Sequence, residues 1–166
     1  NLIDYRLDQQ IETVCGQHNG YKPLIHRRRV TFIKPDIFIV EDRFLKDGGN
    51  RDFELTYQIA PGILISAQAE GIILRRQDVF LFLTFFQGPH QMVGSVEKSW
   101  ISLRFGRKST GNSIKIRGKV VEGLPVYTII TVGRKARNLH AQDGEISFIF
   151  QDRMVHYKGN GVVVVE

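Results

Sequence analysis

The sequence predicts an all-β protein, an antiparallel β-sandwich of about a dozen strands in two packed sheets. Apolar and polar side chains alternate along much of the chain, which is the pattern of half-buried strands. Turn residues separate these stretches at strand-length intervals. Helical spacing is scarce: it is limited to Leu7, Ile11 and Val14 near the start and to one turn's length within residues 133–142.

The first expected strands lie in residues 31–59. The stretch TFIKPDIFIVEDRF should form two strands that break at Pro35, which has no N–H to donate to a sheet ladder. A turn at residues 47–50, DGGN, should lead into FELTYQI. There one face carries Phe53, Leu55, Tyr57 and Ile59, and the other Glu54, Thr56 and Gln58.

The remaining expected strands follow the same logic. After a turn at Pro61–Gly62, the stretch VFLFLTFF (79–86) is apolar on both faces, as in a strand at the centre of a sheet. A turn at Gly111–Asn112 should precede SIKIRGKV (113–120), and EISFIF (145–150) should point Ile and Phe inward. Asn160–Gly161 should close a last hairpin into VVVVE.

Composition narrows the class of protein. The 166 residues suit one domain, so we expect residues 1–166 to form a single unit. The longest apolar run is far shorter than the ~20 residues of a membrane span, so none is expected. Cys15 is the only cysteine, which excludes an intramolecular disulfide and a Cys-rich metal cage. The start has no signal-peptide pattern and no initiator Met, so we expect a processed product or a piece of a longer chain.

The formal net charge of +6 favours a polyanionic partner. Basic residues gather in clusters at residues 27–29, 75–76, 104–108, 115–119 and 134–137. Because Lys115, Arg117 and Lys119 alternate with Ile114 and Ile116, we expect one buried face and one strongly positive face. The alternative is a solvated outer face whose charges discourage edge pairing.

The sequence contains no self-contained active site. The five histidines, His18, His26, His90, His140 and His156, are never two or four residues apart, so we expect hydrogen-bonded surface residues rather than a chelating pair. Glu41 and Asp42 are consecutive and should point to opposite faces of a strand, with Asp42 pairing with one of residues 27–29. Phosphate-binding loops and nucleophile elbows are absent from the sequence.

Two stretches together resemble the heparinase II/III family of polysaccharide lyases, over residues 14–133. The first is VCGQHNGYKPLIHRRRVTFIKPDIFIVEDRF, where the matching residues are His18, Gly20, Tyr21, His26, Arg27, Arg28, Val40 and Asp42. The second joins WISLRFGRKSTGNSIKI to GLPVYTIITVG, through Trp100, Ser102, Phe105, Gly106, Leu124, Pro125 and Thr128.

This resemblance implies the C-terminal β-sandwich of a longer lyase that cleaves acidic, uronate-containing glycans such as heparin, heparan sulfate or alginate by β-elimination. The family's catalytic Tyr and His, and the zinc ligands of several members, match no position of this chain. We therefore expect no catalytic residue, metal ligand or cofactor here, with zinc confined to the full-length protein. An upstream α/α toroid domain and a periplasmic or secreted location are implied in the same way.

The residues expected to bind the glycan are Arg104, Arg107, Lys108, Lys115, Arg117, Lys119, His18 and Tyr21. Arginine and lysine suit sulfate and carboxylate groups. The alternative is a stand-alone sandwich that binds an acidic glycan or a partner protein. A nucleic-acid partner is disfavoured because most Phe residues follow the inward pattern. Trp100 and Tyr21 remain as candidates for exposed aromatic residues, and Trp100 fits a core position equally well.

Overall fold

The computed structural model describes residues 1–46, 50–142, 144–159 and 162–165, and these residues form strands and turns without a helix. Accordingly, no helix in this part of the chain has the length and apolarity of a membrane crossing. Sixteen strands lie within the described ranges. They are β1 (Leu2–Leu7), β2 (Ile11–Tyr21), β3 (Leu24–Ile33), β4 (Ile37–Leu45), β5 (Asp52–Ile59), β6 (Leu64–Gln68), β7 (Gly71–Arg76), β8 (Val79–Gln87), β9 (His90–Met92), β10 (Ser95–Arg104), β11 (Arg107–Lys119), β12 (Val126–Val132), β13 (Arg137–Gln142), β14 (Glu145–Phe150), β15 (Arg153–Lys158) and β16 (Val162–Val165).

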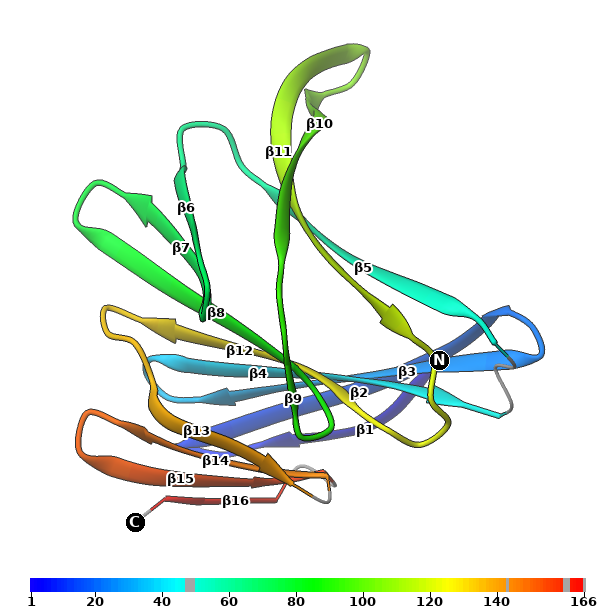
Figure 1. Ribbon diagram of the computed structural model, residues 1–166, viewed down its shortest axis with the longest axis vertical. Coiled ribbons are helices and arrows are strands. Elements are labelled where there is room, and N and C mark those ends of the chain that lie inside the picture. Colours follow the sequence, from blue (N-terminus) through cyan, green and yellow to red (C-terminus); the bar gives the residue numbers. More distant parts are fainter. Residues whose placement is uncertain (47–49, 143, 160–161, 166) are drawn as a thin grey trace.

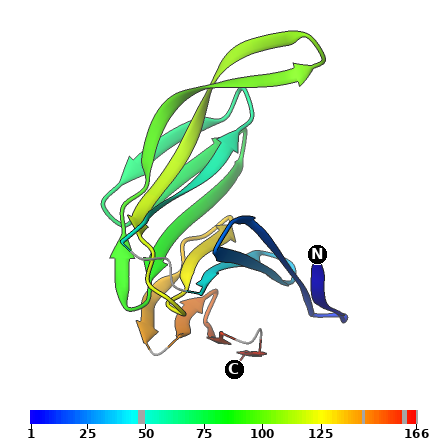
Figure 2. The ribbon, with the colours of Figure 1, turned by 90° about the vertical axis from the view of Figure 1, so that its right-hand side faces the viewer.

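The strands form three antiparallel sheets. The large central sheet has the order β1-β2-β3-β4-β12-β8-β7-β6, with β9 added beside β8. A small sheet, β10-β11-β5, lies at one side, and β13-β14-β15-β16 form the third sheet. Figure 1 shows the third sheet at the bottom and the β10–β11 hairpin rising at the top, and Figure 2 shows the same layering from the side.

Each face of the central sheet packs into its own core. On one face, Ile37, Ile39 and Ile129 pack with residues of β14 and β15 such as Phe148. On the other face, Leu83 and Phe85 pack with residues of β5 and β11, including the fully buried Ile114 and Ile116. The central sheet is therefore covered on both sides, which explains why β8 is apolar on both faces.

The all-β antiparallel sandwich is confirmed, with sixteen strands in three sheets where we expected about a dozen in two. The break at Pro35, the turn at Pro61–Gly62 and the buried faces of β5, β11 and β14 are as expected. The expected turn at 160–161 and all but Asn50 of the expected turn at 47–50 lie outside the described residues.

The two stretches with helical spacing are not helical, in agreement with the all-β prediction. Leu7, Ile11 and Val14 belong to β1 and β2, and residues 137–142 form β13, because backbone pairing with neighbouring strands outweighs an isolated helical spacing. One local expectation is wrong. Gly111 and Asn112 lie inside β11 rather than in a turn. The chain reverses at Phe105–Gly106, where Gly106 adopts φ +72°.

Candidate functional site

The β10–β11 hairpin projects beyond the sandwich and carries the basic residues that the sequence singled out (Figures 1 and 2). Its strands pair from Ser95 opposite Lys115 out to Arg104 opposite Arg107. Large apolar side chains at the tip face solvent: Leu103 is 66% exposed and Phe105 is fully exposed. Phe105 is thus an exception to the inward pattern expected of the phenylalanines.

Three cations at the tip, Arg104, Arg107 and Lys108, lie without an acidic partner in the part of the chain that the structure describes. Arg104 and Arg107 are direct cross-strand neighbours, an arrangement of like charges that is destabilising by itself. The Lys108 ammonium lies 4.6 Å from the centroid of the Trp100 ring. Within the described ranges, no carboxylate comes within ion-pair distance of any of the three. We call Arg104, Arg107 and Lys108 the tip cations.

The three cations in the body of β11, Lys115, Arg117 and Lys119, are instead paired with carboxylates. Lys115 lies 2.9 Å from Glu54 and 3.5 Å from Glu97, and Arg117 lies 2.8 Å and 2.6 Å from the same two side chains. Lys119 lies 2.7 Å from Asp52. We call Lys115, Arg117 and Lys119 the body cations.

This pairing shifts the ionisation of the carboxylates. The hydrogen bond from Arg117 is the main cause that lowers the pKa of Glu97 to about 2. Lys115 is the main cause that lowers the pKa of Glu54 below its ordinary value. The expected strongly positive face is therefore charge-balanced, because the neighbouring strands β5 and β10 place three carboxylates against three cations.

The other two predicted residues, His18 and Tyr21, lie near the β2–β3 turn. Their rings pack edge to face with centroids 5.1 Å apart, and His18 takes part in a hydrogen-bond chain. His18 and His26 are cross-strand partners, with 3.1 Å between His18 Nε2 and His26 Nδ1. His26 Nε2 lies 2.6 Å from Oδ1 of the fully buried Asp42. Arg28 donates to both oxygens of the same carboxylate, at 2.7 and 3.0 Å. The expected pairing of Asp42 with residues 27–29 is confirmed. His18 and His26 are hydrogen-bonded, as expected, although the sequence did not indicate that they bond to each other.

The chain has one consistent assignment of protons when both histidines are neutral. Asp42 accepts from Arg28, so His26 Nε2 carries a proton and donates it to Asp42. His26 Nδ1 is then the acceptor for His18 Nε2–H, and His18 Nδ1 accepts the N–H of Gly20 at 3.3 Å. Both nitrogens of each imidazole ring therefore take part in hydrogen bonds, and these bonds hold the two rings in place.

The strand β11 connects the two groups of predicted residues. A cavity of about 290 Å³ is lined by Tyr21, His26, Phe53 and Val120, and also by Asp52 and Glu54, which pair with the body cations. The tip cations lie at the other end of β11 (Figure 1). The eight residues thus form two groups at opposite ends of a strand rather than one compact site.

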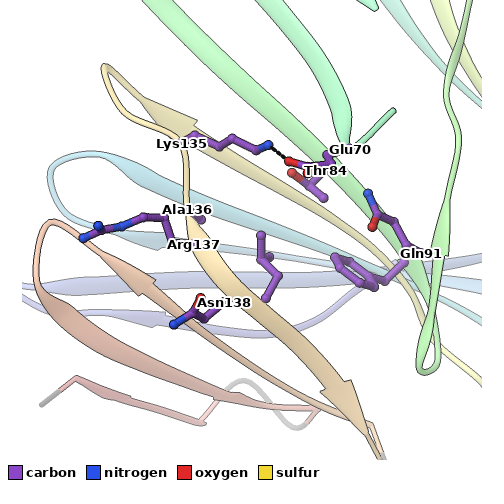
Figure 3. Close-up of a pocket in the computed structure, with 9 residues that line it drawn as sticks. Glu70, Thr84, Gln91, Lys135, Ala136, Arg137 and Asn138 are labelled. Carbon is purple, nitrogen blue, oxygen red and sulfur yellow. Dashed lines mark hydrogen bonds and ion pairs between the residues drawn. The ribbon is translucent and has the colours of Figure 1, made fainter. Parts of the chain in front are cut away.

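A further cavity of about 400 Å³ lies between the central sheet and the start of β13 (Figure 3). Its lining includes Thr84, Phe86, Gln91 and Asn138. Lys135 points to Glu70 and forms an ion pair with it, which lowers the pKa of Glu70 below its ordinary value. No local sequence pattern predicts this cavity, because its residues come from separate strands.

Metal binding finds no support in the described part of the chain, where no three His, Cys, Asp or Glu side chains gather in an arrangement that could hold an ion. The histidine pair has its nitrogens directed at one another, at Asp42 and at Gly20. Zinc therefore has no ligand set among these residues, and its presence in a longer protein stays a prediction.

Comparisons with known proteins support the resemblance to the heparinase II/III family. The family model described as "Heparinase II/III-like, C-terminal" matches residues 4–152. A solved heparinase III structure covers the whole chain at 17% identity with a TM-score of 0.69. The heparan sulfate lyase HepC from Pedobacter heparinus does so at 11% identity with a TM-score of 0.70. The chain spans 27% of each of these two structures. No curated protein sequence matches significantly.

Proposed function

Because this chain belongs to the heparinase II/III-like C-terminal family, we propose that it is the glycan-binding β-sandwich of a polysaccharide lyase and is not catalytic by itself. The substrate class is an acidic, uronate-containing polysaccharide such as heparin, heparan sulfate or alginate. The catalytic residues that transfer protons then lie upstream of this chain, where an α/α toroid domain precedes the sandwich, and the protein is periplasmic or secreted.

The observation that carries this proposal is the set of tip cations. Arg104 and Arg107 are held side by side across the hairpin, and their charges have no carboxylate to balance them among the described residues. An anion placed between two guanidinium groups removes that repulsion. Sulfate and carboxylate groups of an acidic glycan supply such anions at regular intervals.

The test is retention on immobilised heparin. Replacing all three tip cations by alanine should lower the salt concentration needed for elution, and should reduce the slope of log affinity against log salt by about 2–3, because three ionic contacts are lost. The parent chain should also release no unsaturated uronate from heparin or alginate, measured by ultraviolet absorbance.

A matched control removes three positive charges from the body of β11 instead of from the hairpin tip. Alanine at Lys115, Arg117 and Lys119 should reduce the slope by less, because the body cations are already paired. Equal losses in the two triple variants would show that only net charge matters, which would refute binding at the tip. Circular dichroism checks that both variants are folded.

The body cations should become available when their carboxylates are neutralised. The double variant Glu54→Gln and Glu97→Gln should elute from heparin at higher salt, with a slope increased by up to about two. Acidifying the parent from pH 7 to pH 5 should not have this effect through Glu54 and Glu97, because both pKa values are lowered and the side chains stay ionised. Unchanged elution of the double variant would show that the glycan does not reach the body of β11.

A further inference from the structure

The face of the hairpin that carries Trp100 is an extension of the core-facing surface. Val96 and Trp100 are four residues apart and therefore lie on the same face of β10. Their partners on β11 are Ile114 and Thr110. Ile114 is fully buried in the core, whereas Trp100, four residues farther along from Val96, is 60% exposed. The β10–β11 hairpin extends beyond the central sheet (Figure 2), and the pairing register places Trp100 on the face that continues the core-facing surface, where its side chain stays mostly exposed.

The ring of Trp100 is covered by a cation instead of by the core. Lys108 places its ammonium 4.6 Å from the ring centroid, within the range of a cation–π contact. Such a contact is weak at an exposed site. Lys108 can therefore leave the ring at little cost, unlike Lys115, which two carboxylates hold.

We propose that Trp100 is a stacking platform for a sugar ring of the acidic glycan, with Lys108 as a displaceable cover. When the apolar C–H face of a sugar takes the place of the ammonium on the indole, Lys108 moves beside the bound sugar and pairs with its sulfate or carboxylate. This inference rests on the proposed function and adds to it a residue that recognises the sugar rather than its charge.

The spacing along the hairpin indicates the length of the ligand. Arg104 lies four residues from Trp100, which is about 13 Å along an extended strand. Arg107 lies three residues before Thr110, the partner of Trp100, so the Arg104–Arg107 pair lies on the other face of the hairpin. A single anion cannot reach both positions, whereas an oligosaccharide that passes around the hairpin tip can stack on Trp100 and present an acidic group to Arg104 and Arg107. The ligand class is thus an acidic oligosaccharide of several sugar units.

Trp100 is the only tryptophan of the chain, so its fluorescence reports this position alone. A heparin oligosaccharide should change the emission of the parent chain, and also that of Lys108→Ala, in which no ammonium is left to displace. Inorganic polyphosphate, which has charge but no sugar ring, should leave the emission of Lys108→Ala unchanged. Equal responses of that variant to both polyanions, or no response to heparin, would overturn the proposal.

Affinity provides the second measurement. Trp100→Ala should bind the heparin oligosaccharide about three- to tenfold more weakly, the range of one aromatic contact, with an unchanged salt slope and unchanged affinity for polyphosphate. The control is Tyr5→Ala, which removes an aromatic side chain of β1 that is about as exposed as Trp100. This variant should bind like the parent. If Trp100→Ala lowers the affinity for both polyanions equally, or for neither of them, Trp100 is not a stacking platform. If the parent binds no heparin at all, the proposed function fails as well.

Discussion

Replacing Asp42 by alanine is expected to lower the free energy of unfolding by about 3–5 kcal/mol, the cost of breaking a buried ion pair by removing one partner. Asp42 is fully buried and accepts hydrogen bonds from Arg28 and His26. Its removal leaves the Arg28 guanidinium without a counterion on the central sheet, and it leaves His26 Nε2–H without an acceptor. Urea denaturation followed by circular dichroism measures the loss.

Asp52→Ala is the matched control for that experiment. Its carboxylate pairs with Lys119 at 2.7 Å, but the two side chains are 74% and 61% exposed. The expected cost is therefore at most about 1 kcal/mol. A similar cost for the Asp42 and Asp52 variants would mean that the chain from His18 to Arg28 contributes nothing to stability, against the geometry.

Glu41→Ala should have an effect of similar size, about 3–5 kcal/mol, but through the opposite face of the central sheet. The Glu41 carboxylate is almost completely buried, pairs with Arg43 and accepts the Tyr157 hydroxyl at 2.6 Å. Tyr157 belongs to β15, so this contact joins the central sheet to the third sheet. Denaturant unfolding measures the loss.

A double-mutant cycle with Tyr157→Phe isolates that contact. The single phenylalanine variant should cost about 1.5–3 kcal/mol, as expected for a hydrogen bond to a charged group. It should cost much less in the Glu41→Ala background, because the acceptor is already gone. Additive costs would show that the two side chains do not interact across the layers.

The same contact makes the stability sensitive to alkali. Burial, and then the negative charge of Glu41, raise the pKa of Tyr157 well above its ordinary value of 10.0. A raised pKa in the folded state contributes stability that is complete below pH 10 and decreases as the pH rises above it. Tyr157→Phe should therefore flatten the decline in unfolding free energy above pH 10.

The candidate site shows where a single sequence stops being informative. The alternation of Ile114 and Ile116 with Lys115, Arg117 and Lys119 predicted the faces of β11 correctly. The alternation in residues 53–59 predicted that Glu54 lies on the outer face of its own strand. No local pattern predicts that this strand pairs with β11. The neutralised body cations could not be distinguished from the tip cations for that reason.

The histidine pair shows the same limit of sequence-based prediction for two strands that are consecutive in the chain. His18 and His26 are eight residues apart, a spacing with no meaning in one strand. They meet because β2 and β3 form an antiparallel hairpin whose register pairs them. A one-residue slip would have turned them to opposite faces.

The sequence by itself determined the all-β class, the buried faces of β5, β11 and β14 and the opposite orientations of Glu41 and Asp42, because alternation is a property of the extended backbone and is repeated every two residues. Only the tertiary structure decided which charges are neutralised, that the histidines join a buried carboxylate, and that Trp100 lies beyond the core. Those outcomes depend on strand order and register, which are set by packing among residues far apart in the chain.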